Sequence, residues 1–380
     1  MQFGQFIVLF LVSTATAQNA SSLTDALGSE NSSLSNLNAL LEQNPQFVQS
    51  LNNAQNVTFL APNNDALDAI MNNSNGTNSS VPASSQGGIE ALLSYHVLNG
   101  TYYASNFTNT SQFIPTRLTN TSYTNLTGGQ VVECLSEGQE NVIFISALRQ
   151  NVSSVTNNIN FTGGTIYIVD GVLSIPQNLT ETLTNANLTA YAGAITATNQ
   201  TQNLTGGGNA TIFAPNNAAF YAIGNIVGNT TSDELRRILG YHVVNGTVAY
   251  LSDLQNTTLT TENGENINIR IINNETYVNA ALVTVPDILY ENGVIHVIDQ
   301  VLNPNDTSAT PNTSATSAGI GYTGATSGTI PFTSGVATPT ETYPAATSAG
   351  GPATAAAVPV KTGAVGAAAL FGGAAIFANF

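Results

Sequence analysis

The sequence has very little charge, and almost none of that charge is positive. Of its 380 residues only 6 are Lys or Arg, against 22 Asp or Glu, which gives a formal net charge of −16. Such a chain repels phosphate backbones and anionic lipid headgroups, so nucleic acid is excluded as a partner. Lys361 is the only lysine. Something other than lysine must therefore keep the surface soluble.

Cysteine is also nearly absent. Cys134 stands alone in the chain, so no disulfide bond can form within one molecule. The thiol is either buried or bridged to another chain, and we expect it to be buried and to take no part in redox chemistry.

The motifs that usually mark catalysis are missing as well. The chain has three histidines, no Gly-x-Ser-x-Gly or His-Glu-x-x-His pattern and no glycine loop that opens a helix. We predict that the protein is not an enzyme and holds no metal and no cofactor. A hydrolase that uses His and Asp is the least favoured alternative.

Sites for N-linked glycan are abundant. The pattern Asn-x-Ser/Thr, the acceptor for such glycan, occurs about two dozen times. Some matches arise by chance in a chain rich in Asn and Thr, but the whole set predicts a glycoprotein in which glycan replaces charge as the solvated coat. The acceptors that we single out are Asn56, Asn99, Asn125, Asn187, Asn245 and Asn274.

The N-terminal end has the pattern of a secretory signal peptide. An apolar run from Phe6 to Val12 precedes Ala15-Thr16-Ala17, the small-x-small pattern at which signal peptidase cuts. We expect residues 1–17 to be removed, because the apolar run is too short to cross a bilayer.

The C-terminal end has the pattern of a glycosylphosphatidylinositol (GPI) signal. Small residues, a spacer and an apolar tail from Ala364 to Phe380 follow one another, the order at which the tail is exchanged for lipid. The candidate attachment residues are Ser348, Ala349 and Gly350, so residues 351–380 would be lost. A weak transmembrane tail is the alternative. We expect the protein on the outer face of the plasma membrane, through this lipid, or in the cell wall.

The segment before this signal lacks apolar periodicity. Residues 305–350 are rich in Ser, Thr, Ala, Gly and Pro, a composition that cannot bury enough apolar surface to fold. We expect a disordered stalk.

The rest of the chain contains an internal repeat. Three blocks occur twice, in the same order, and this predicts two duplicated domains. The blocks are Asn56–Asn64 with Asn209–Asn217, Leu93–Gly100 with Leu239–Gly246, and Gly164–Leu173 with Gly293–Leu302. The spacing is longer in the first copy, which predicts loop insertions there.

Each block also has a local interpretation. Thr211-Ile212-Phe213 is expected to be a strand that Pro215 ends, with Asn216 or Asn217 capping the next helix. Thr231 has Glu234 three residues later, as in a capping box, and the helix that it begins leads into a strand with Tyr241-His242. Leucines from Leu34 to Leu41 fit one helical face. The predicted class is therefore α+β.

At these blocks the chain resembles the FAS1, or fasciclin-like, family. The resemblance rests on Phe213-Ala214-Pro215-Asn216, on Tyr241-His242 and on Asn292–Asp299, and it covers about residues 21 to 304. It implies two tandem domains, each with a β-sandwich or wedge and a helical layer. We place them at residues 21–176 and 178–304.

The resemblance also implies a role in adhesion and a contact site. In some members a Pro-Asp-Ile stretch before the closing motif, together with the Tyr-His region, is linked to receptor binding. Here Pro286, Asp287 and Ile288 hold that place beside Tyr241 and His242. The first copy has Asn157-Asn158-Ile159 and Tyr167 where the second has Pro286-Asp287-Ile288 and His296. The second domain is therefore the better candidate for contact.

Two kinds of function remain after these exclusions. We expect a surface glycoprotein that mediates cell adhesion or organises the cell wall or matrix, with protein or polysaccharide partners. The alternative is a polysaccharide- or lipid-binding surface module without catalysis.

Overall fold

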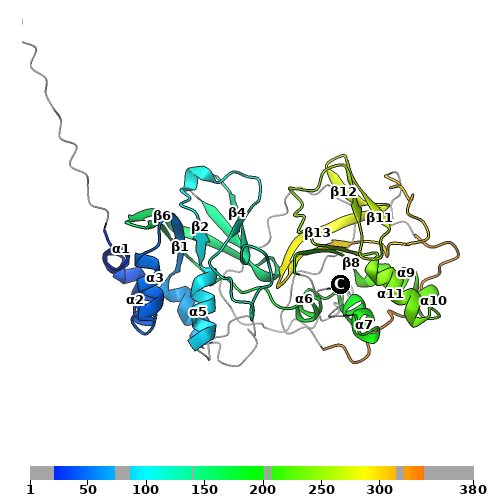
Figure 1. Cartoon of the computed structure of the whole chain (residues 1–380), viewed down its shortest axis with the longest axis horizontal. Coiled ribbons are helices and arrows are strands. Elements are labelled where there is room, and N and C mark those ends of the chain that lie inside the picture. Colours follow the sequence, from blue (N-terminus) through cyan, green and yellow to red (C-terminus); the bar gives the residue numbers. More distant parts are fainter. Residues whose placement is uncertain are drawn as a thin grey trace, which may run out of the picture.

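The computed structural model describes residues 21–72, 86–138, 141–200, 204, 208–313 and 321–337. These residues form two α+β domains, each with one sheet and a group of helices beside it (Figure 1). The predicted fold class is confirmed. The predicted signal peptide, the GPI signal and its attachment residues lie outside the described residues.

The first domain begins with helices and ends with its sheet. Its helices are α1 (Leu23–Ser29), α2 (Asn31–Glu42), α3 (Pro45–Asn52), α4 (Asn64–Asn72) and α5 (Gln86–Tyr95), with short 3-10 turns η1 (Ala104–Asn106) and η2 (Ala147–Arg149). Its strands are β1 (Val57–Pro62), β2 (Val97–Asn99), β3 (Gln112–Pro115), β4 (Val131–Ser136), β5 (Val142–Ile145), β6 (Asn151–Phe161) and β7 (Gly164–Val169).

The second domain has the same plan. Its helices are α6 (Leu179–Asn185), α7 (Thr189–Ala197), α9 (Asn217–Ala222), α10 (Gly224–Val227) and α11 (Ser232–Gly240). Its strands are β8 (Ala210–Pro215), β9 (Val243–Asn245), β10 (Thr257–Thr260), β11 (Asn266–Ile272), β12 (Glu275–Val278), β13 (Ala281–Tyr290) and β14 (Gly293–Ile298).

The strand order shows that the repeat in the sequence is a repeat in structure. The sheets run β3-β4-β5-β6-β7-β1-β2 and β10-β11-β12-β13-β14-β8-β9. In each sheet one pair is parallel, β1 with β7 and β8 with β14. Glycine is required at the start of β7 and of β14. A Cβ atom at Gly164 or Gly293 would lie 1.8 or 1.9 Å from the carbonyl oxygen of the neighbouring strand.

Each sheet also folds back toward its own first strand. In the first domain Thr116, directly after β3, bridges Leu98 in β2. In the second, the backbone N–H of Glu262 donates to the carbonyl of Val243 at 2.8 Å. The last and first strands of each order therefore approach one another at one end, which gives each sheet the shape of a wedge.

Predicted helical faces and caps are confirmed. Leu34, Leu37 and Leu41 are buried on α2. Asn216 caps α9 by accepting from the N–H of Ala219, and Thr231 caps α11 by accepting from the N–H of Glu234.

The predicted position of the Tyr-His pair inside a strand is wrong. Tyr95 is the last residue of α5 and Tyr241 follows the last residue of α11, while β2 and β9 begin two residues later. The histidines lie at these helix ends because their Nδ1–H groups donate to the carbonyls of Leu92 and Ile238, four residues earlier. That bond fixes a helical turn.

The described part of the predicted stalk packs against the second domain. Residues 321–337 form no helix or strand, but Gly328 donates to the carbonyl of Tyr221 in α9 at 3.0 Å. The backbone of Phe332 lies so near α7 that a Cβ atom on Gly193 would be 1.8 Å from the Phe332 carbonyl oxygen. We call residues 321–337 the strap.

None of the described helices is both long enough and apolar enough to cross a membrane.

Candidate functional site

The segment that carries Pro286-Asp287-Ile288 lies in the middle of β13. The pairing of β13 with β14 is irregular between Val283 and Ile288, and Asp287 has a φ of 60°. This bulge turns the Asp287 side chain inward, where 3% of the residue is exposed. Its Oδ1 accepts a hydrogen bond of 2.9 Å from the backbone N–H of Leu251.

His296 lies behind this carboxylate. Its Nε2 lies 2.8 Å from the carbonyl oxygen of Ala249 and its Nδ1 lies 3.4 Å from the backbone nitrogen of Asp287. A neutral ring that is protonated on Nε2 satisfies both contacts. Burial lowers the pKa of His296 to about 4, with Arg149 adding to the fall, and burial raises the pKa of Asp287 to about 6.

The first domain builds the same arrangement from different residues. Asn158 has a φ of 61°, and its Oδ1 accepts from the N–H of Ala104 at 3.1 Å. The hydroxyl of Tyr167 donates to the carbonyl of Tyr102 at 3.0 Å. Asn158 and Tyr167 thus fix the same loop that Asp287 and His296 fix in the second domain.

Tyr241 and His242 are also internal. The hydroxyl of Tyr241 donates to the carbonyl of Asn266 at 2.8 Å, and Nε2 of His242 accepts from the N–H of Leu302 at 2.9 Å. Neither residue has exposed surface. Burial lowers the pKa of His242, like that of His96, to about 4. These rings are neutral structural links between a helix end and the end of the domain.

The Pro286–Ile288 segment also meets the first domain. Arg149, in η2, donates through Nη1 to the carbonyl of Pro286 at 3.1 Å, and the same nitrogen lies 3.1 Å from Oε2 of Glu133. The Glu133 side chain is 2% exposed. Burial raises the pKa of Glu133, while the Arg149 charge opposes that rise. One guanidinium therefore joins a buried carboxylate of the first domain to β13 of the second.

Apolar and backbone contacts extend this junction. Leu148 belongs to the apolar core of the second domain, and the rings of Phe113 and Tyr250 stack with centroids 3.7 Å apart. Gln130 donates to the carbonyl of Tyr290 at 3.3 Å, and the backbone N–H of Asn125 donates to the carbonyl of Glu291 at 3.2 Å. We call this set of contacts the domain junction.

The sequence singled out Asn125 and Pro286 for other roles and did not predict a contact between the two domains. The one feature of the sequence that pointed to the junction was the longer spacing between the repeated blocks in the first copy. Five residues, Ser146 to Gln150, join β5 to β6, whereas Asn279 and Ala280 alone join β12 to β13. The extra residues carry Leu148 and Arg149, so one of the predicted insertions forms the contact with the second domain.

A sequence model of the fasciclin domain matches residues 32–176 and 186–304. The chain belongs to the fasciclin domain family. The predicted resemblance is thereby confirmed for both copies of the repeat.

Relatives of this fasciclin-domain chain span both domains. It is 33% identical to a fasciclin-like arabinogalactan protein of Arthroderma benhamiae over 295 residues, which are 78% of this chain and 69% of that one. It is 28% identical to a fasciclin-like arabinogalactan protein of Cercospora beticola, over 77% of this chain and 78% of that one. Among solved structures, the FAS1 domain pair of the insect cell adhesion molecule Fasciclin I matches 73% of this chain and 99% of that one, at 18% identity and a TM-score of 0.35.

The six singled-out glycan acceptors all lie on the surface of the fasciclin domains. Their amides differ in what they contact. Oδ1 of Asn56 accepts from the N–H of Thr101, whereas Nδ2 of Asn99 donates to the carbonyl of Thr116. Nδ2 of Asn125 lies 2.9 Å from a carboxylate oxygen of Glu291 and 3.0 Å from Oδ1 of Asn292. Asn125 therefore uses both amide hydrogens in the domain junction.

Other reactive groups of the two domains are either buried or dispersed. Cys134 is a buried free thiol, as predicted, with Sγ 3.6 Å from the carbonyl oxygen of Val132. Across the described ranges, no three residues among His, Cys, Asp and Glu are grouped so that they could hold a metal ion.

Proposed function

We propose that this protein is a cell-surface glycoprotein that mediates cell adhesion or organises the cell wall or matrix through its two fasciclin domains. The observation that carries the proposal is membership of the fasciclin domain family over both copies of the repeat. The surface supports it, because many sequons lie on a surface that has few charges. Two relatives are named fasciclin-like arabinogalactan proteins.

The interior of the domains supports a function without catalysis. Each of the three histidines is fully buried and has both ring nitrogens in contact with backbone groups. A general base needs a ring that reaches a substrate and titrates near the working pH. Rings with a pKa of about 4 inside the core do neither.

The contact site that the family resemblance implies stays part of the proposal in a narrower form. Pro286 is half-buried, whereas Asp287, Ile288, Tyr241 and His242 are internal. We therefore propose that partners touch the surface around Pro286, and that the other four residues hold this surface in place. Pro286→Ala should reduce partner binding while lowering the unfolding temperature only slightly, through the added freedom of the unfolded chain.

A second candidate function is binding of a polysaccharide or a lipid. A cavity of about 710 Å³ lies between α6, α7 and the strap, with Ala192, Gly193, Phe332 and Val336 on its apolar side and Gln177 and Glu181 among its polar residues. Small-molecule sites typically occupy 300–1,000 Å³ with a largely apolar lining and a few polar groups. The cavity has this size and this mixture.

The two candidates are separated by attachment and retention assays. Cells that display the full chain should adhere to one another, or to matrix, more strongly than cells without it. Leu148→Ala, at the domain junction, should weaken adhesion, and Val155→Ala, at an exposed position on β6, should not. Unchanged adhesion together with saturable retention of the purified protein on wall polysaccharide would favour the second candidate.

A further inference from the structure

We propose that Asn256 carries an N-linked glycan that covers the free edge of the second sheet. The corresponding edge of the first sheet is covered by the second domain. The inference rests on the proposed function in one respect, since the chain must pass through the secretory pathway to be glycosylated.

The two edges correspond residue by residue. Strands β3 and β10 hold the same end position in the two sheets. After β3, Thr116 donates through its backbone N–H and its hydroxyl to the carbonyl of Gln130. After β10, Thr261 makes the same two bonds to the carbonyl of Glu265. Thr116 and Thr261 are therefore equivalent positions. Counting back three residues from each makes Thr258 the equivalent of Phe113.

The edge of the first domain is protected in two ways. Phe113 stacks on Tyr250 of the second domain. Pro115 ends the strand and has no N–H to offer to another chain. A neighbouring domain and a proline therefore cover or block β3.

The edge strand of the second sheet, β10, has neither a covering domain nor a proline. Among the described strands, β10 pairs only with β11, and it consists of three threonines and one leucine without proline or charge. Thr257, Thr258 and Thr260 are exposed. Threonine favours strands, and an exposed edge strand without lysine or proline is a template for pairing with another chain.

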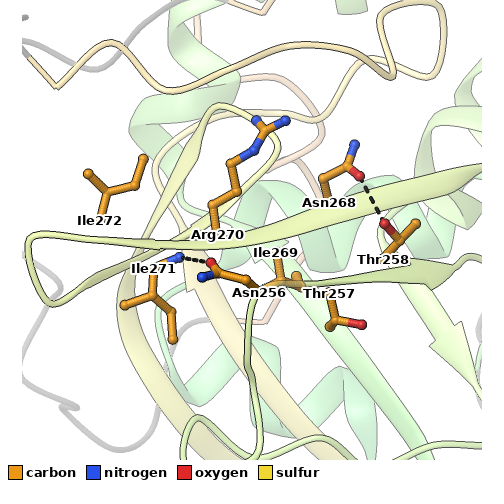
Figure 2. A pocket seen from close by; sticks show the side chains of 8 residues that line it. All are labelled: Asn256, Thr257, Thr258, Asn268, Ile269, Arg270, Ile271 and Ile272. Carbon is orange, nitrogen blue, oxygen red and sulfur yellow. Dashed lines mark hydrogen bonds between the residues drawn. The ribbon is translucent and has the colours of Figure 1, made fainter.

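Asn256, directly before β10, is set for modification. It forms the sequon Asn256-Thr257-Thr258 and is exposed. Figure 2 shows its amide oxygen turned toward β11, where it accepts from the N–H of Ile271 at 2.8 Å, and its nitrogen turned away. Glycan is attached to that nitrogen, so the bond that holds the side chain persists in the modified protein.

The surface beside Asn256 can hold the innermost sugar. A hollow of about 400 Å³ lies along β10 and β11, lined by the residues labelled in Figure 2. Ile271, which is 39% exposed, offers an apolar surface on the side of β11 where Asn256 lies. Asn268 and Arg270 point to the other side and donate to the carbonyls of Thr307 and Ala309. The contrast is Asn125, where a glycan would displace an amide hydrogen bond of the domain junction.

The test uses the full chain, secreted from yeast, and glycopeptide mapping with enzymatic release in ¹⁸O-labelled water. We expect glycan at Asn256. Thr258→Ala should abolish it and shift the protein from monomer to dimer or larger species in sedimentation velocity. Thr258→Ser keeps the sequon, so it should keep both the glycan and the monomer.

A double variant separates edge pairing from misfolding. Thr257→Lys with Thr258→Ala has no glycan but places a lysine on the edge, so it should return to monomer with the unfolding temperature of Thr258→Ala. An unmodified Asn256 beside occupied sequons at Asn56 or Asn245 would overturn the inference and leave the proposed function intact. A monomeric Thr258→Ala protein, or a double variant that still associates, would also overturn it. The absence of glycan at every sequon would contradict both this inference and the proposed function as a glycoprotein.

Discussion

Asp287 and Asn158 occupy the same bulge in the two domains and accept the same kind of backbone hydrogen bond. They differ in charge, and this difference gives the domains different responses to pH. Burial raises the pKa of Asp287 from 3.8 to about 6. The folded protein thus binds this proton more tightly than the unfolded chain does, and stability falls as pH rises from about 4 to about 6.

Asp287→Asn should remove this loss of stability. Asparagine keeps the oxygen that accepts from Leu251 and does not titrate. We expect little difference from the wild type near pH 4 and a gain near pH 7 of about 3 kcal/mol, from a shift of about two pKa units. Thermal unfolding of both proteins across this pH range is the measurement.

The first domain supplies the matched control. Asn158→Asp places a carboxyl group in the equivalent bulge and should introduce the same loss of stability above its raised pKa. An Asp287→Asn gain that is equal at pH 4 and pH 7 would contradict the argument from burial of charge.

The sequence singled out Asp287 and the equivalent Asn158, but it did not show that their side chains point into the domain. The family resemblance implied a contact site at Pro286-Asp287-Ile288, but the sequence does not show the bulge that turns the Asp287 side chain inward. The same limit applies to His242. Its neighbours Val243 and Val244 suggested a strand, while the bond from its ring to Ile238 holds it in the last turn before that strand.

At the scale of elements, the domain junction depends on one short insertion. Residues 146–150 bring Leu148 into the core of the second domain and Arg149 against the carbonyl of Pro286. The caps at Asn216 and Thr231 were predictable, because their signals are local in the sequence. The junction was not, because it joins residues about 140 positions apart and no local pattern specifies such a contact.

Arg149→Ala should loosen the junction. It leaves the Glu133 carboxylate, which is 2% exposed, without its cation, and breaking a buried pair in this way costs about 3–5 kcal/mol. We expect calorimetry to show a lower unfolding temperature and separate transitions for the two domains.

The double variant Glu133→Gln with Arg149→Met is the control for Arg149→Ala. It removes both charges and should recover most of the lost stability, because no unpaired charge stays buried. Equal losses in the single and double variants would show that the ion pair does not hold the junction.

The strap depends on close approach to helices at two glycines. A Cβ atom on Gly193 would lie 1.8 Å from the carbonyl oxygen of Phe332, and one on Gly224 would lie 2.9 Å from Gly328. Gly193→Ala should displace the strap while favouring helix α7 through its higher helix propensity. Proteolysis should then cut within residues 321–337 faster than in the wild type.

Gly28→Ala in α1 is the matched control, since a Cβ atom there meets nothing within 4 Å. Cleavage of the strap should be unchanged in this variant. Equal cleavage of the Gly193→Ala and wild-type proteins would mean that the strap does not require this contact.

At the scale of the whole molecule, glycan and lipid are proposed to take the roles that charge and a membrane helix have in other surface proteins. If residues 348–350 receive a GPI lipid, a phosphatidylinositol-specific phospholipase should release the protein from intact cells as a band that shifts on glycosidase treatment. Retention on cells after digestion of a known GPI-anchored control would contradict the anchor.

The strap also determines how the molecule would respond to mechanical force. A chain tethered at its C-terminal end and bound to a partner through its domains transmits tension into the strap from the C-terminal end of the strap. The load would peel the strap from that end, one contact at a time, before it reached either sheet. Fully extended, the 17 residues of the strap would span at most roughly 56 Å, at about 3.3 Å per residue. The molecule would then extend under load by releasing the strap, while the domain junction stays closed.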